Sequence, residues 1–110
     1  MTVKEFRIQY ALGSLSGDDL IELVYMQYTP KAILTALSKN KNYWIRCGVA
    51  CNPNTPIKVL TKLSNDKDRN VRIWVTRNPY TPIKILEKLS NDTDTYIRRC
   101  AREELDRRYT

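Results

Sequence analysis

Apolar residues recur along this chain at helical spacing, i, i+3 and i+4, and they do not alternate as they would in a strand. In the clearest segment, Ile57, Leu60 and Leu63 follow this spacing, and polar residues fill most positions between them. Such spacing predicts an amphipathic helix. Its start is marked by Thr55, which is suited to the N-cap, and by Pro56, which is suited to the first helical position.

A second apolar stripe follows in the same segment. Val71, Trp74 and Val75 recur at helical spacing after Asp68, a residue type that often caps the start of a helix. The helix should end before Pro79, because a proline disfavours the helical conformation in the residue that precedes it. The N-cap position has equivalents in the neighbouring segments at Asn42 and Asp94.

Three segments of the chain repeat this two-helix pattern with a period of 26 residues. They begin at Thr29-Pro30, Thr55-Pro56 and Thr81-Pro82. Their paired leucines are Leu34/Leu37, Leu60/Leu63 and Leu86/Leu89. Self-similarity at such a period predicts a solenoid, in which each unit buries its apolar face against its neighbours. Because solenoids usually provide extended binding surfaces, we expect a surface for a partner and no catalytic pocket.

The two ends differ from the repeated segments. Residues 1–27 fit the pattern poorly and predict a helical cap, with a capping box at Ser16 and Asp19 where its second helix starts. Near the other end, Glu104-Leu105 replaces the Asn-Pro dipeptide that ends earlier units. The last helix should therefore continue from about Tyr96 to Tyr109. We expect the chain to be one complete small domain, and the alternative is that it is a fragment of a longer repeat array.

Two of the segments share a composite motif. It consists of Asn-Pro-x-Thr-Pro, then Leu-x-x-Leu, then an Asp followed five and six residues later by Val-Arg or Ile-Arg. One copy comprises Asn52–Pro56, Leu60/Leu63, Asp66 and Val71-Arg72, and the other comprises Asn78–Pro82, Leu86/Leu89, Asp92 and Ile97-Arg98. In this motif the chain resembles the HEAT/armadillo class of α-solenoids and, more narrowly, the variant leucine-rich repeat family. The resemblance covers residues 29–106.

This resemblance implies an all-α fold, a short right-handed HEAT-like superhelix of three 26-residue two-helix repeats with a helical N-terminal cap. The unit is slightly longer than is usual in the variant leucine-rich repeat family, so two-helix HEAT-like geometry describes it better. The expected single domain, residues 1–110, divides into a cap and three repeats at 1–27, 28–54, 55–80 and 81–110.

The resemblance also implies a structural role for the repeated arginines. In HEAT-like repeats this arginine pairs with the preceding aspartate and ties adjacent units together, which implies the internal ion pairs Arg72–Asp66 and Arg98–Asp92. Arg46 is the exception, because Asn40 occupies its aspartate position. Two alternatives remain for Arg46: no acidic partner, or an acid from a neighbouring unit.

The available side chains argue against an enzyme. The chain contains no His, which excludes Ser-His and Cys-His nucleophile pairs and a Cys₂His₂ zinc site. Cys47 and Cys51 share a helix face and could supply two metal ligands, but Cys100 lies two units away and no fourth thiolate exists. The founding member of the variant leucine-rich repeat family carries an iron–sulfur cluster on N-terminal cysteines, yet residues 1–46 here contain no Cys. We therefore expect no catalytic residue, no metal and no cofactor.

Composition adds an expectation about location. No apolar run in residues 1–31 is long enough for a signal peptide or a membrane span. Three cysteines, an odd number without disulfide-like spacing, fit a reducing compartment. The sequence therefore predicts a cytoplasmic protein that has no membrane partner.

Positive charge is distributed unevenly. The formal net charge is +7, whereas residues 1–27 carry two cationic and four anionic side chains, so the excess lies in residues 28–110. On the predicted first helices, lysines recur in i, i+4 pairs and form an alternative basic patch of Lys58, Lys62, Lys84 and Lys88. On the predicted second helices, which line the concave side of HEAT-like arrays, the candidate partner-binding residues are Tyr43, Trp44, Arg69, Ile73, Arg77, Arg99 and Arg102.

Two functions suit such a surface. The first is binding of a protein or peptide, with an acidic partner favoured, because Arg and Tyr are enriched at protein interfaces. The alternative is nucleic-acid binding through phosphate contacts on the same basic faces, which the pI near 9.5 favours. Of the two tryptophans, Trp74 is expected in the core and Trp44 on the surface. Surface lysines that only maintain solubility are a third interpretation. No small-molecule substrate is expected.

Overall fold

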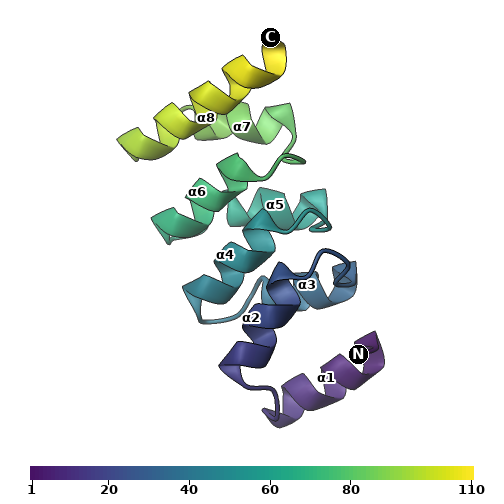
Figure 1. Cartoon of the computed structure of the whole chain (residues 1–110). Coiled ribbons are helices and arrows are strands. Elements are labelled where there is room, and N and C mark those ends of the chain that lie inside the picture. The colour runs from purple at the N-terminus through teal and green to yellow at the C-terminus, as the bar shows by residue number, and fades with distance from the viewer.

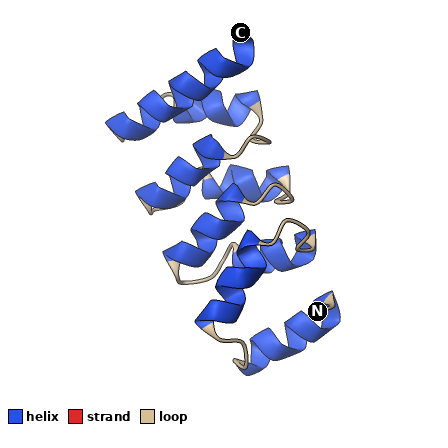
Figure 2. Ribbon diagram, viewed as in Figure 1, coloured by secondary structure: helices blue, strands red, loops and turns tan.

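The chain folds into eight α-helices and contains no strand, which confirms the all-α prediction (Figure 2). The computed structural model describes residues 1–110. The helices are α1 (Val3–Leu12), α2 (Gly17–Tyr25), α3 (Lys31–Leu37), α4 (Tyr43–Cys51), α5 (Ile57–Leu63), α6 (Arg69–Arg77), α7 (Ile83–Leu89) and α8 (Thr95–Tyr109).

The predicted N-caps of the even-numbered helices are confirmed. Side-chain oxygens of Asn42, Asp68 and Asp94 accept hydrogen bonds from the backbone N–H two residues later, at 2.8–2.9 Å. The capping box of α2 is also present: the Ser16 hydroxyl accepts from the Asp19 N–H at 3.1 Å, and the Asp19 carboxylate accepts from the Ser16 N–H at 2.8 Å. Each cap satisfies amides that the first helical turn leaves without partners.

The predicted N-cap role of Thr55 is wrong. Pro56 occupies the N-cap position of α5, without a side-chain cap, and the Thr55 hydroxyl donates a 2.6 Å hydrogen bond to the Val49 carbonyl near the end of α4. Thr81 does the same to the Val75 carbonyl of α6, at 2.7 Å. The threonine therefore satisfies a carbonyl at the end of the preceding helix and does not serve the amides of the next one.

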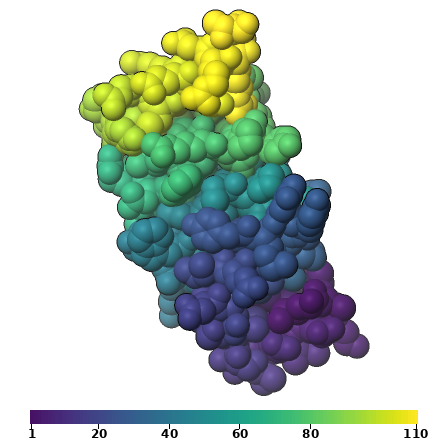
Figure 3. All heavy atoms as spheres, in the orientation of Figure 1, coloured from purple at the N-terminus to yellow at the C-terminus, as the bar shows by residue number.

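The even-numbered helices α2, α4, α6 and α8 pack side by side in chain order, and α3, α5 and α7 lie along one side of this row (Figure 1). The resulting body measures 44 × 24 × 19 Å, with the two termini at opposite ends of its long axis (Figure 3). The core extends along the body and includes the fully buried Leu34, Leu60 and Leu86 of the odd-numbered helices. Val49 and Val75 contribute from the even-numbered helices.

Helices α2 and α4 approach each other closely at Gly48. A Cβ atom at this position would lie 2.2 Å from the Val24 Cγ2 atom, which no real contact permits. The equivalent position one unit later holds Trp74, which is half-buried and packs against the core. The contact between α2 and α4 therefore requires a residue without a side chain at position 48, whereas the equivalent position of α6 accommodates a large ring.

Two buried asparagines join consecutive even-numbered helices. The Asn52 amide donates to the carbonyls of Val24 and Met26 at 2.7 and 2.8 Å, and the Asn78 amide donates to those of Ala50 and Asn52 at 2.8 and 3.1 Å. The side-chain oxygens are also occupied, because each accepts from the backbone N–H two residues later. These asparagines thus satisfy carbonyls that the end of the preceding helix leaves free.

In the last helix an arginine takes over this role. Glu104 occupies the position that corresponds to Asn78, and the Arg108 guanidinium donates to the Asn78 carbonyl at 3.1 Å and to the Thr81 carbonyl. Glu104 pairs with Arg108 at 3.1 Å and orients it. The C-terminal helix is therefore attached through a charged side chain.

The acidic partners that the resemblance implied for the repeated arginines are wrong. Where an arginine pairs with an aspartate, that aspartate lies 26 residues later in the chain than the implied position. Arg72 pairs with Asp92 at 3.0 Å and contacts Asp66 only through that residue's backbone carbonyl. Arg46 correspondingly pairs with Asp66 at 2.8 Å, so the alternative of an acid from a neighbouring unit is confirmed. Arg98 contacts Asp92 only through the backbone carbonyl. The guanidinium groups of Arg46 and Arg72 therefore each connect the loop before their own helix to the next equivalent loop, whereas Arg98 contacts only the loop before its own helix.

We predict that Asn78→Ala lowers the free energy of unfolding by roughly 1–3 kcal/mol, because it leaves buried carbonyls without a hydrogen-bond donor. Urea denaturation followed by circular dichroism would measure the loss. Asn91→Ala is the matched control, because Asn91 is exposed and should change stability by no more than about 0.5 kcal/mol. Equal effects of the two changes would contradict a structural role for Asn78.

Candidate partner-binding surface

Three arginines surround one tyrosine where α6 and α8 lie side by side. The guanidinium carbons of Arg69 and Arg99 lie 5.8 and 5.4 Å from the centre of the Tyr96 ring, within the range of a cation–π interaction. Arg77 donates a 2.7 Å hydrogen bond to the Tyr96 hydroxyl. We call these four residues the arginine–tyrosine cluster.

The arginines of the cluster differ in how their charges are balanced. Arg69 pairs with Asp94 at 2.6 Å. Arg99 approaches Glu103 only at 3.7 Å, and the side chains of Arg99 and Glu103 are both about two-thirds exposed. Arg77 pairs with no carboxylate and lies over the Trp74 ring, 5.6 Å from its centre. Arg77 is therefore the cation of the cluster with the least compensated charge.

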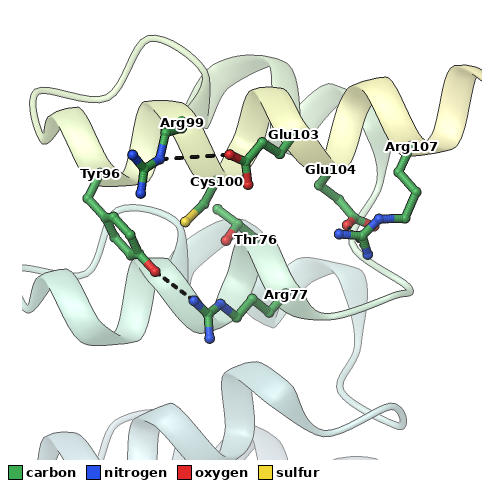
Figure 4. Close-up of a pocket in the computed structure, with 8 residues that line it drawn as sticks. All are labelled: Thr76, Arg77, Tyr96, Arg99, Cys100, Glu103, Glu104 and Arg107. Carbon is green, nitrogen blue, oxygen red and sulfur yellow. Dashed lines mark hydrogen bonds and ion pairs between the residues drawn. The ribbon is translucent and has the colours of Figure 1, made fainter.

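An open pocket of about 340 Å³ lies next to the cluster (Figure 4). Arg77 reaches it from α6, and Tyr96, Arg99 and Glu103 reach it from α8 (Figure 4). The remaining lining residues are Thr76, Cys100, Glu104 and Arg107. A planar guanidinium at a pocket wall offers several hydrogen-bond donors in one plane, which is the geometry that binds a carboxylate or a phosphate.

The structure brings together Arg69, Arg77 and Arg99, three of the residues predicted for the surface. Arg102 is exposed but does not line the pocket. Tyr43 and Trp44 lie on α4, where their rings stack at 5.1 Å, and they are not part of the pocket either. As predicted, Trp44 is largely exposed.

Ile73, which the sequence predicted to be an apolar residue of the partner-binding surface, is not exposed. It is buried, with 8% of its surface exposed, and Cys47 at the equivalent position of α4 is fully buried. The reason is that α4 and α6 are each packed between two neighbouring helices, so the positions assigned to the outside of a lone helix become covered.

Two residues of the site were missed. Tyr96 occupies in α8 the position that Trp44 occupies in α4, so the repeat register itself could have indicated it. Trp74 was assigned to the core alone, but its half-buried ring also supports Arg77. Only the approach of α6 to α8 brings Arg77, Trp74 and Tyr96 into one site.

The lysines Lys58, Lys62, Lys84 and Lys88 are all exposed, on α5 and α7. Lys88 hydrogen-bonds to the Ser64 hydroxyl at 3.2 Å and to the Asn65 side-chain oxygen, so it also links α7 to the end of α5. These lysines and the arginine–tyrosine cluster belong to different helices and can be tested separately.

The three cysteines are free. Burial raises the pKa of the Cys47 thiol to about 11 and also raises the pKa of Cys51. These thiols therefore stay protonated at neutral pH, where the thiol is a poor nucleophile and a poor metal ligand. No group of three or more His, Cys, Asp or Glu residues is placed to hold a metal ion. None of the eight helices combines the length and the apolar character needed to cross a membrane.

Comparisons with protein-family models, with curated proteins and with solved structures find no match to this chain. Any functional conclusion therefore depends on the geometry of the chain itself.

Asp94 should make the free energy of unfolding depend on pH. Its hydrogen bond with Arg69 lowers the pKa of the Asp94 carboxyl from 3.8 to about 2. A carboxyl with a depressed pKa in the folded state stabilises the fold above its unfolded pKa, and this stabilisation is lost as pH falls. Asp94→Asn should therefore reduce stability at pH 7, and the difference from wild type should shrink between about pH 4 and pH 2.

Urea midpoints measured across this pH range would test the prediction. Asp106→Asn is the matched control, because Asp106 is exposed and makes no ion pair. A difference between wild type and Asp94→Asn that does not vary with pH would show that the Arg69–Asp94 ion pair contributes nothing.

Proposed function

We propose that the chain is a short right-handed HEAT-like solenoid that serves as a non-enzymatic interaction module and binds an acidic segment of a partner protein. The solenoid is supported by helix starts at Lys31, Ile57 and Ile83, which are spaced by the 26-residue period. It is also supported by the asparagine bridges at Asn52 and Asn78, which recur with the same spacing. The resemblance to variant leucine-rich repeats is consistent with both.

The arginine–tyrosine cluster is the proposed binding site, and the state of Arg77 is the observation that carries the proposal. Arg77 has no carboxylate partner, lines an open pocket and is held in place by Trp74 and Tyr96. A guanidinium has five N–H donors, and only one is used here. Because Arg77 is already oriented, little side-chain entropy would be lost when a carboxylate binds it.

The distribution of charge favours a short acidic segment over nucleic acid. Asp94, Glu103 and Glu104 lie among the arginines and would repel a continuous phosphate backbone. On α4, Tyr43 and Cys51 take the positions of Arg69 and Arg77, so the cation stripe does not continue along the body. A nucleic acid carries a charge about every 3.4 Å along each strand and favours a longer basic track.

The raised pKa values of Cys47 and Cys51 support a non-enzymatic role, because neither thiol is activated as a nucleophile. Three free cysteines are consistent with the predicted cytoplasmic location.

We predict that Arg77→Gln weakens binding of a fluorescein-labelled peptide rich in Glu, because it removes a charge-assisted hydrogen bond worth roughly 1.5–3 kcal/mol. This corresponds to a loss of about ten- to hundredfold in affinity, which fluorescence anisotropy would measure. Arg102→Gln is the matched control: it removes the same charge from an exposed position outside the pocket and should have little effect.

The same titration with single-stranded oligonucleotides tests the alternative. The proposal would be contradicted if the oligonucleotide bound more tightly than the peptide. Nucleic acid would be favoured if this binding were retained in Arg77→Gln but lost in a variant with four Lys-to-Glu changes, at Lys58, Lys62, Lys84 and Lys88.

A further inference from the structure

A second recess lies at the N-terminal end of the body, away from the arginine–tyrosine cluster. It is a groove of about 520 Å³ between α1, α2 and the start of α3, and we call it the N-terminal groove. Its volume lies within the range of small-ligand pockets and is sufficient for several side chains of a partner. No residue of the arginine–tyrosine cluster lines it.

The groove is lined by apolar side chains. Leu15 and Leu23 are half-buried, Ile33 is buried beneath them, and Met26 is about half exposed. Tyr28 lies at the edge with 84% of its surface exposed. Methionine fills irregular spaces easily and is over-represented at adaptable binding surfaces. Apolar surface of this kind, bordered by polar residues, is typical of interaction sites.

The charged side chains of the groove are opposite in sign to the net charge of the molecule, and the one cationic group of a lining residue is the amino terminus of Met1. The charged side chains that line it are Asp19 and Glu22, and no Lys or Arg side chain does so. The whole chain has a net charge of +7. Asp19 already accepts a hydrogen bond from the Ser16 N–H through one carboxylate oxygen, whereas Glu22 makes no ion pair. Glu22 therefore remains available to an incoming cation.

The acidic and apolar residues lie on one face of α2. Asp19, Glu22 and Leu23 are spaced i, i+3 and i+4 within the helix, and Met26 follows directly after its C-terminal end. A partner helix with apolar residues flanked by Lys or Arg would match this face. Recognition of amphipathic helices in apolar grooves uses this i, i+3 and i+4 spacing.

We propose that the N-terminal groove binds a basic amphipathic helix of a partner protein. Leu23 and Met26 contact its apolar face, and Glu22 pairs with its flanking cations. The charge complementarity selects this occupant over an acidic or neutral one, since the rest of the chain repels cations and would disfavour their nonspecific binding.

The test uses the full chain and a fluorescein-labelled helical peptide of Leu and Lys, compared with the same peptide with Gln in place of Lys, which no arginine of the arginine–tyrosine cluster attracts by charge. We expect the Leu/Lys peptide to bind at least about tenfold more tightly by fluorescence anisotropy. Glu22→Lys should weaken its binding by about tenfold or more. Glu87→Lys is the matched control, because it makes the same charge change at an exposed site on α7 and should leave binding within about twofold.

A second measurement locates the peptide. The chain has two methionines, Met1 and Met26, and both line the groove. In a sample labelled at the methionine methyl groups, the NMR signals of both methyl groups should shift when the Leu/Lys peptide is added. Circular dichroism of Glu22→Lys would establish that the variant is folded.

Several outcomes would overturn the proposal. These are equal binding of the two peptides, equal effects of Glu22→Lys and Glu87→Lys, or unchanged methionine signals at saturation. Sedimentation that shows a dimer dissociated by Glu22→Lys would assign the groove to a second copy of the chain and would also overturn it. Binding of the Glu-rich peptide at Arg77 is independent of these results.

Discussion

The hydrogen bonds of Asn52 and Asn78 are the constraint on which the rest of the structure depends. Each side chain donates to two carbonyls of the preceding unit and accepts one amide of its own loop. An isolated helix would expose these terminal carbonyls to water, but here they are covered by the next unit and need an internal donor. The asparagines therefore hold α4 against α2 and α6 against α4. Arg108 extends the same kind of contact to α8 by donating to the Asn78 carbonyl, and the position of Tyr96 relative to Arg77 depends on that attachment.

The ion pairs act at the other end of the same helices. Arg46–Asp66 and Arg72–Asp92 are largely buried, and each also has a guanidinium that donates to a carbonyl of its own unit. A buried charge is tolerated only when its partners are complete, so these cations are not available to a ligand. Arg69 is likewise neutralised by Asp94. Because Arg46, Arg69 and Arg72 are used in these pairs, Arg77 differs from them in having a guanidinium without a carboxylate partner.

Local features of the fold could be predicted from the sequence, whereas contacts between units could not. The capping box at Ser16 and the N-cap at Asp68 depend on residues within one turn, and both predictions are confirmed. The partner of Arg72 depends on how two units are offset in space, and sequence spacing alone assigned the wrong aspartate. Ile73 was placed on the surface because a lone helix would expose it, but α6 has neighbours on two sides. The partner-binding role of the surface stays a prediction.

The attachment of the last helix by Arg108 has a consequence for modular construction. Where Asn-Pro follows an even-numbered helix, the chain turns and its asparagine donates to the end of the preceding even-numbered helix. Where Glu104-Leu105 stands instead, the helix continues to Tyr109 and Arg108 supplies the donor. Asn78 donates to the Asn52 carbonyl and Arg108 donates to the equivalent carbonyl of Asn78, but only after Asn-Pro does the chain turn into a further helix pair. Two adjacent residues thus decide whether the chain turns at this point or continues as a helix, while a donor to the neighbouring helix end is kept in both cases.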